Sequence, residues 1–178
     1  SDGAPPAWAW VEVVRALAGE VDPGPRRTAL APLLDEHVPI SGESDASFGR
    51  FLLSRALIDY LTAAAGPSPV AVVLDDLHRG DSETRALLDT VATATGGVRL
   101  LIVAAYRPAE VPDGLRDVLA GLAALPPVRL ALGGLNRADA ERLIGSVAGV
   151  RPAPGVVAAL VDRTPGHPLY LAARARLL

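Results

Sequence analysis

The chain has 178 residues, of which 50% are apolar, and a formal net charge of −3. This length and composition are typical of one globular domain, or one domain with a small appendage, that buries a sizeable core. The absence of cysteine excludes disulfides and thiolate metal sites, and three histidines leave few ligands for an imidazole site. The interspersed charges form no basic stripe, so we expect no direct nucleic-acid contact from this segment.

All 17 basic residues are arginine, and the chain contains no lysine and no methionine. The lack of lysine excludes a glycine-rich phosphate loop ending in Lys-Ser/Thr within the chain. The apolar runs are shorter than the ~20 residues that a membrane helix needs, so we expect a cytoplasmic protein without membrane contact. Because the sequence starts at Ser1 and not at methionine, we expect a cut end there.

The first part of the chain predicts helices. Apolar residues at helical spacing indicate a helix over residues 8–17, and a short helical turn is expected from Thr28. A longer helix is predicted from Asp45 to the stop signal Gly66-Pro67. The face that we expect this helix to bury consists of Phe48, Phe51, Leu52, Leu57, Ile58 and Leu61.

The middle of the chain predicts a parallel sheet. An uninterrupted apolar run over residues 70–74 indicates a buried strand. Asp81 opens the next predicted helix as its N-cap, and Gly96-Gly97 ends it. A second strand is predicted over 98–106, and the intervening helix makes the three elements a right-handed βαβ unit.

A further helix over 115–125 and a third strand over 128–132 complete the predicted sheet. From Asn136, an N-cap residue, the pattern is helical to the end of the chain. The predicted fold class is therefore α/β, a parallel sheet flanked by helices with a C-terminal helical segment. We expect the boundary between the two parts at residues 135 and 136.

Asp75 and Asp76 are the first candidate site residues, because they follow directly on the predicted strand over 70–74. In open α/β sheets the ligand crevice lies beyond the carboxyl ends of the strands. One acid there can hold Mg²⁺ through a bound water while its neighbour orients an attacking water. The alternative is that the pair forms only a helix cap or a solvated turn.

Arg107 ends the adjacent predicted strand, where a guanidinium could reach the γ-phosphate of a nucleotide. The alternative is an ordinary salt bridge with Asp75 or Asp76, which is compatible with the first reading when no nucleotide is bound. His78 lies three residues after Asp75 and could in principle add a second metal ligand, but a loop histidine that packs or hydrogen-bonds is the preferred interpretation.

The C-terminal helical part contains the turn Gly166-His167-Pro168. A rigid turn of this kind could press a proline ring against a flat base, but Gly and Pro also suit a plain connection between helices. Trp8 and Trp10 are interpreted as packing residues and not as a platform for stacking bases.

Four segments in order resemble the ATPase module of the STAND class of AAA-like signalling NTPases, found in large ATP-binding LuxR-type regulators and related actinobacterial transcriptional activators. The match extends over nearly the whole chain. Residues 72–78 (VVLDDLH) resemble the Walker B segment of that family, and Ala105-Tyr106-Arg107-Pro108 its sensor strand. The other two segments are residues 3–11, which resemble the stretch after the family's second strand, and residues 164–171, which contain its GxP turn.

The resemblance implies a partial P-loop NTPase-type fold, with residues 1–135 as a nucleotide-binding core that lacks Walker A and residues 136–178 as a helical, lid-like segment. It implies an ATP/ADP switch with Mg²⁺, in which bound nucleotide fixes the helical segment against the sheet. The roles that it implies are Asp75 as the acid that holds Mg²⁺ through water, Asp76 as the catalytic or water-orienting acid, Arg107 as the γ-phosphate sensor, and Gly166 and Pro168 as the adenine-binding turn.

The chain departs from the family at Arg79-Gly80, where Trp-Ala is usual, at Ala105, where threonine is usual, and at His167, where asparagine is usual. Without the threonine hydroxyl we expect hydrolysis to be slow or absent. The family also begins with a strand, a phosphate loop, a helix and a second strand, so we expect about 50 residues before Gly3 to be missing. An incomplete sheet that oligomerises or is covered by rearranged helices would follow.

The leading hypothesis is a fragment of an ATP-binding regulatory ATPase of a transcriptional regulator, inactive by itself, whose partners are nucleotide, flanking regulatory domains and further copies of itself. The alternative is a non-catalytic scaffold in which a degenerate ATPase fold binds another protein. A third hypothesis is a metal-dependent hydrolase built on Asp75, Asp76 and His78.

Overall fold

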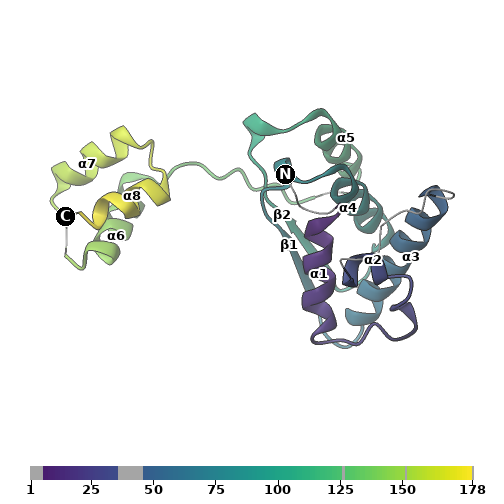
Figure 1. Cartoon of the computed structure of the whole chain (residues 1–178). Helices are drawn as coiled ribbons and strands as arrows, with labels where there is room; N and C mark the ends of the chain where they lie inside the picture. The colour runs from purple at the N-terminus through teal and green to yellow at the C-terminus, as the bar shows by residue number, and fades with distance from the viewer. Residues whose placement is uncertain (1–5, 36–45, 126, 151, 178) are drawn as a thin grey trace. The chain divides into compact units, whose positions relative to one another are not determined.

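The computed structural model describes residues 6–35, 46–125, 127–150 and 152–177. The chain divides into two compact units, Ser1–Pro127 and Val128–Leu178, each of which is described by itself. Unit 1 contains the elements α1 (Trp8–Ala18), α2 (Ala31–Leu34), α3 (Ala46–Ala64), β1 (Val70–Leu74), α4 (Ser82–Ala94), β2 (Leu100–Ala104) and α5 (Asp113–Leu122). Unit 2 contains α6 (Arg137–Ala148), α7 (Pro154–Arg163) and α8 (Pro168–Ala175), as Figure 1 shows.

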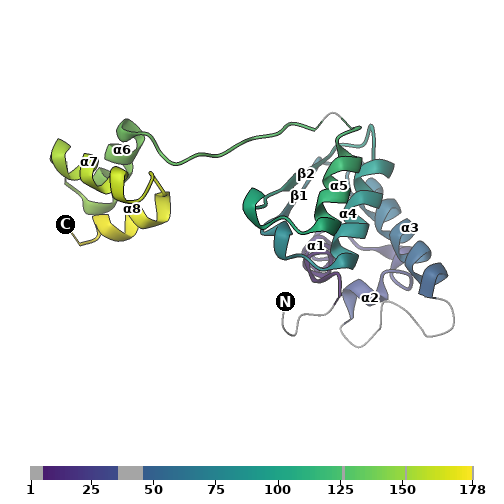
Figure 2. The ribbon, with the colours of Figure 1, turned by 90° about the horizontal axis from the view of Figure 1, so that it is seen from above.

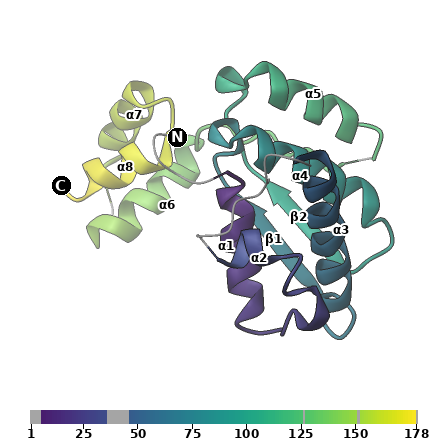
Figure 3. The ribbon, with the colours of Figure 1, turned by 45° about the vertical axis from the view of Figure 1, so that its right-hand side comes forward.

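The sheet of unit 1 consists, among the described residues, of β1 and β2, which pair in parallel. Their register runs from Val70↔Leu100 to Leu74↔Ala104, so the two strands end side by side. Helix α4 connects them, and Figure 3 shows the strands next to one another with α1 and α4 close by. The predicted α/β class and the predicted βαβ unit are therefore confirmed.

The prediction of a third strand over residues 128–132 is wrong. In the structure this segment belongs to no ladder, and its apolar side chains are exposed, with Val128 at 87%, Leu130 at 81% and Leu132 at 94%. The alternating sequence suits a strand, but a strand forms only where a neighbouring edge supplies backbone donors and acceptors. The contacts accordingly place the boundary between the units at Pro127, before the expected position.

Only one face of the sheet is packed. Val72 and Leu74 are buried, whereas Val73 is 64% exposed and Leu101 is 60% exposed, because successive side chains of a strand point to opposite faces. Figure 2 shows α3 and α4 on the same side of the two strands. The predicted buried strand is therefore buried on one face only, since no described helix of unit 1 covers the second face.

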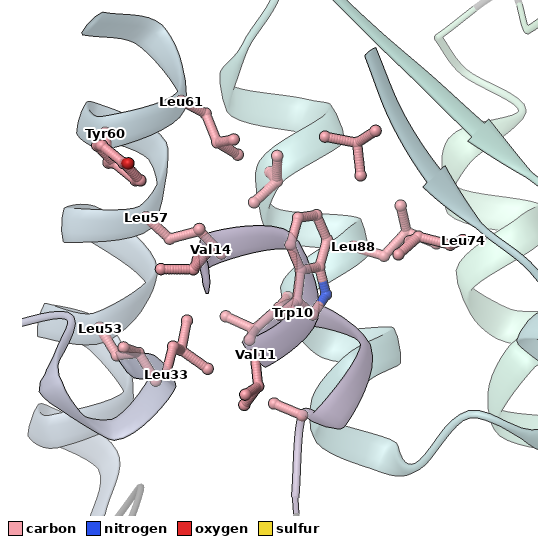
Figure 4. Close-up of a cluster of buried hydrophobic side chains, with 14 of the residues drawn as sticks. Trp10, Val11, Val14, Leu33, Leu53, Leu57, Tyr60, Leu61, Leu74 and Leu88 are labelled. Atoms are coloured by element: carbon pink, nitrogen blue, oxygen red, sulfur yellow. The ribbon is translucent and has the colours of Figure 1, made fainter. Parts of the chain in front are cut away.

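Trp10 lies at the centre of the packed side. Its indole is fully buried and points between α3 and α4, near Leu57 and Leu88 (Figure 4). The indole N–H donates to the carbonyl oxygen of Thr84 at 3.0 Å, so the aromatic ring also joins α1 to α4. Trp10 is thus a core residue, as the sequence predicted, while Trp8 is 37% exposed.

The buried face of α3 differs from the predicted one. Leu57 and Leu61 are buried as expected, but Phe48, Phe51 and Leu52 are 55%, 62% and 44% exposed. The buried stripe recurs every three or four residues, which is the helical period, and the three exposed residues fall outside this stripe. Its members are Leu53, Ala56, Leu57, Tyr60, Leu61 and Ala64.

Asp81 joins the N-termini of α1 and α4. Its Oδ1 accepts hydrogen bonds from the backbone N–H of Thr84 at 2.8 Å and of Ala7 at 3.1 Å, and its Oδ2 accepts from the Thr84 hydroxyl at 2.7 Å. Burial by itself raises the pKa of the Asp81 carboxyl, but these hydrogen bonds favour the ionised form and bring the pKa below its ordinary value. The predicted cap of α4 is confirmed, and it also holds α1.

Unit 2 is a small helical cluster. Ile144 of α6, Val157 of α7 and Leu171 of α8 are buried against one another. Asn136 caps α6 as predicted, since its Oδ1 accepts from the N–H of Asp139 at 2.9 Å. The three helices of the C-terminal part are therefore present, and the last one begins at Pro168.

Trp10→Phe should lower the free energy of unfolding by about 1–3 kcal/mol, because it removes the indole donor to Thr84 and part of the packed ring. Trp8→Phe is the matched control and should change stability by less than about 0.5 kcal/mol. Urea unfolding followed by circular dichroism measures both. Equal losses in the two variants would contradict the central position of Trp10.

The pH dependence of stability should report on Asp81. Its folded pKa is lowered, so its contribution is present above the ordinary value of 3.8 and is lost as pH falls through the folded value. Asp81→Asn should therefore be less stable than the wild type by about 1 kcal/mol at pH 7, and the difference should shrink below pH 3.8. Urea unfolding between pH 7 and strongly acid solution tests this, with the exposed Asp117→Asn as control. A difference that stays constant with pH would contradict it.

Candidate functional site

The carboxyl end of β1 forms a turn that carries the two acids. Ala105, which follows β2, donates its N–H to the Leu74 carbonyl at 2.9 Å and accepts the N–H of Leu77 at 2.9 Å. Asp75 and Asp76 lie between these two hydrogen bonds and are exposed. The backbone of one residue beyond β2 therefore fixes the turn on which both carboxylates stand.

Asp76 adopts a left-handed conformation, with φ 48° and ψ 38°. Aspartate tolerates this region better than most residues, and non-glycine residues held there are frequent at functional sites. Asp75 supports the turn, because its Oδ1 accepts the backbone N–H of Asp76 at 2.8 Å. Asp81 caps α4, and Asp76 makes no side-chain cap hydrogen bond although it precedes the short 3-10 turn Leu77–Arg79. The solvated turn is therefore the remaining structural alternative.

Arg107 lies just beyond β2, in the position that the sequence predicted. Its Nη1 donates to Oε1 of Glu110 at 3.0 Å, and its side chain is 60% exposed. Glu110 was not predicted from the sequence, although the separation of three residues in a short helical turn is a known spacing for an ion pair. The hydrogen bond from Arg107 lowers the pKa of the Glu110 carboxyl, while desolvation raises it, and the net pKa lies below the ordinary value.

The side chain of His78 is buried and lies next to Arg107 and Glu110. The backbone N–H of Arg107 donates to its Nδ1 at 3.4 Å. Its Nε2 lies 3.3 Å from Oε2 of Glu110 and 3.8 Å from Oδ1 of Asp76. The preferred interpretation of His78 as a packed, hydrogen-bonded loop residue agrees with this environment.

A metal site built on Asp75, Asp76 and His78 finds no support in the described residues. Among them, no group of three or more histidine, aspartate or glutamate side chains is placed to hold a metal ion. A magnesium ion held by Asp75 through water differs from such a cluster, because phosphate oxygens and water complete its coordination. The two acids are exposed oxygen ligands, which fits that role chemically.

The predicted adenine-binding residues lie in unit 2. Gly166 has a φ of +72°, and its carbonyl accepts the N–H of Leu135 at 2.8 Å. A Cβ at this position would collide with the backbone of Leu135, so only glycine fits. Pro168 is the first residue of α8 and is exposed, a usual position for proline in a helix.

The structure thus brings part of the predicted site together. Asp75, Asp76 and Arg107 stand at the ends of paired strands of unit 1, with His78 and Glu110 added to them. Comparisons with protein-family models, with curated proteins and with solved structures gave no significant match to this chain. In the part of the chain that the structure describes, no helix is both long and apolar enough to cross a membrane.

Gly166→Ala should destabilise unit 2 by about 1–3 kcal/mol, because alanine is strained at this φ and its Cβ meets the backbone of Leu135. Gly155→Ala is the matched control, since a Cβ there meets nothing within 4 Å. Hydrogen exchange of the α6 and α8 amides measures the loss locally. Exchange rates that rise equally in the two variants would contradict a structural role for Gly166.

Proposed function

We propose that this chain is a segment of a STAND-type, AAA-like ATPase module that acts as an ATP/ADP switch in a transcriptional regulator. The observation that carries the proposal is the placement of Asp75, Asp76 and Arg107 at the carboxyl ends of two adjacent parallel strands. Ligands of open α/β sheets bind at this edge. Two carboxylates and one guanidinium there match the charges of a magnesium ion and a phosphate.

Each residue has a distinct role in the proposal. Asp75 holds Mg²⁺ through water, Asp76 orients the attacking water, and Arg107 contacts the terminal phosphate. Ala105 supplies no hydroxyl near this point, so the switch hydrolyses ATP slowly or only binds it. Gly166 and Pro168 enter as the adenine-binding turn on the strength of the sequence resemblance alone.

The phosphate-binding half of the site is not supplied by this chain. It has no lysine, and Arg107 is the cation that the proposal assigns to the phosphate. In the proposal, a glycine-rich loop ending in Lys-Ser/Thr precedes Gly3 in the full-length protein and holds the phosphates. Its strand would pair with the free edge of β2.

A protein-interaction scaffold is the second candidate, and the bare face of the sheet favours it. Val73, Leu101 and Val103 are 64%, 60% and 44% exposed, although they stand on adjacent strands. Apolar side chains grouped in this way often mark a surface that another element covers. In a scaffold the acids and Arg107 would have no ligand in common.

Calorimetric titration with Mg-ATP and Mg-ADP separates the two functions. We expect no binding or weak binding to this chain, and micromolar binding to the chain extended at its N-terminus by the phosphate-loop segment. Asp75→Asn in the extended chain should weaken binding at least about tenfold, because a ligand of the Mg²⁺ shell is lost. Asp59→Asn on α3 removes a comparable charge elsewhere and should leave the affinity unchanged.

Two outcomes would overturn the proposal. Tight binding to the chain without the extension would show that the missing phosphate loop is not needed. No heat with either chain would favour the scaffold.

A further inference from the structure

Glu110 lies between two donors that can both use its carboxylate. Its Oε1 accepts from Arg107 at 3.0 Å, and its Oε2 lies 3.3 Å from Nε2 of His78. In the described part of the chain this nitrogen has no hydrogen-bond partner, and the imidazole is only 1% exposed. A buried donor without an acceptor is unfavourable. A small movement of the Glu110 carboxylate that forms a hydrogen bond with Nε2 of His78 would therefore lower the free energy.

Nε2 of His78 lies close to the Glu110 carboxylate but makes no hydrogen bond with it. The backbone N–H of Arg107 donates to Nδ1 of His78, so Nδ1 is the acceptor and the neutral ring carries its proton on Nε2. The carboxylate oxygens near Nε2 belong to Glu110 and Asp76, at 3.3 and 3.8 Å. Arg107 thus contacts both groups: its backbone N–H occupies Nδ1 of His78, which leaves Nε2 as the ring atom that can donate, and its side chain binds Glu110.

We propose that Glu110 competes with phosphate for the guanidinium of Arg107, and that His78 is the positioning residue that receives the carboxylate when phosphate displaces it. The inference rests on the proposed function, because it takes Arg107 as a phosphate ligand. It adds to that function a built-in competitor, which keeps Arg107 paired while no phosphate is bound. The two arrangements of Glu110 differ by the exchange of one hydrogen bond for another.

The ion pair between Arg107 and Glu110 is weak enough for phosphate to replace the carboxylate. The side chains of Arg107 and Glu110 are 60% and 45% exposed, and pairs in such surroundings are weak and screened by salt. A phosphate carries more charge than a carboxylate and matches the planar guanidinium with two oxygens. A multiply charged phosphate therefore displaces Glu110, whereas a single carboxylate in solution does not.

The test is a titration of the full chain with inorganic pyrophosphate in the absence of metal, followed by NMR signals of the Arg107 backbone and side-chain N–H groups. We expect saturable shifts in the wild type and an affinity about two- to fivefold higher in Glu110→Gln, which corresponds to the loss of an exposed ion pair. Asp113→Asn is the matched control, because it removes the same charge from another exposed pair, with Arg116, and should leave the affinity unchanged. Arg107→Ala should abolish the pyrophosphate-dependent shift of the His78 Nε2–H signal.

A second signal tests the positioning role of His78. In the wild type, pyrophosphate should move the Nε2–H proton of His78 downfield, because it gains Glu110 as an acceptor. A His78 with a merely structural role would leave this signal in place, and that result would overturn the assignment.

Three results would each overturn the proposed competition. The first is a pyrophosphate affinity of Glu110→Gln that is equal to or lower than that of the wild type. The second is the same increase in affinity in Asp113→Asn, and the third is no shift of the Arg107 signals. None of these outcomes decides the proposed function, which depends on the Mg-ATP titration of the extended chain. Micromolar Mg-ATP binding there, with an unchanged pyrophosphate affinity in Glu110→Gln, would keep the function and remove the competitor.

Discussion

The packing of α1 and α4 against one face of a two-stranded sheet is the constraint on which unit 1 depends. Two strands alone are marginal in water, and this pair is covered on one side only. Trp10 fills the space between the helices, and Asp81 fixes their N-termini to one another. Because the strands end in register, this packing also keeps the turn with Asp75 and Asp76 beside the segment with Arg107.

The elements that the sequence predicted well are those with local signals. The cap residues Asp81 and Asn136 mark the starts of α4 and α6 because their side chains bond to backbone N–H groups three residues further on. The apolar run before Asp75 predicted β1, and the helix between two such runs predicted their parallel pairing. That topology was sufficient to place the acids and Arg107 at one edge.

The failures concern features that depend on distant neighbours. Residues 128–132 have the alternation of a strand, but no edge pairs with them in the structure. Phe48 and Phe51 are the two phenylalanines of the chain and were assigned to the core by hydrophobicity, yet the phase of the buried stripe of α3 leaves them exposed. Glu110 was missed because its approach to His78 depends on how the segment after β2 folds back, which periodicity does not predict.

Two main-chain hydrogen bonds of Ala105 and the hydrogen bond from the Arg107 N–H to the His78 imidazole hold the two halves of the candidate site together. Ala105 bonds through both its N–H and its carbonyl to the residues that flank the acidic pair, and the Arg107 N–H bonds to His78. The position of Asp75 and Asp76 is thus insensitive to the side chain at residue 105. Under the proposed function, an alanine at this position would leave the turn in place and would remove only a hydroxyl that could orient water. Under the proposed function, such a site would bind and sense a phosphate and would hydrolyse ATP slowly.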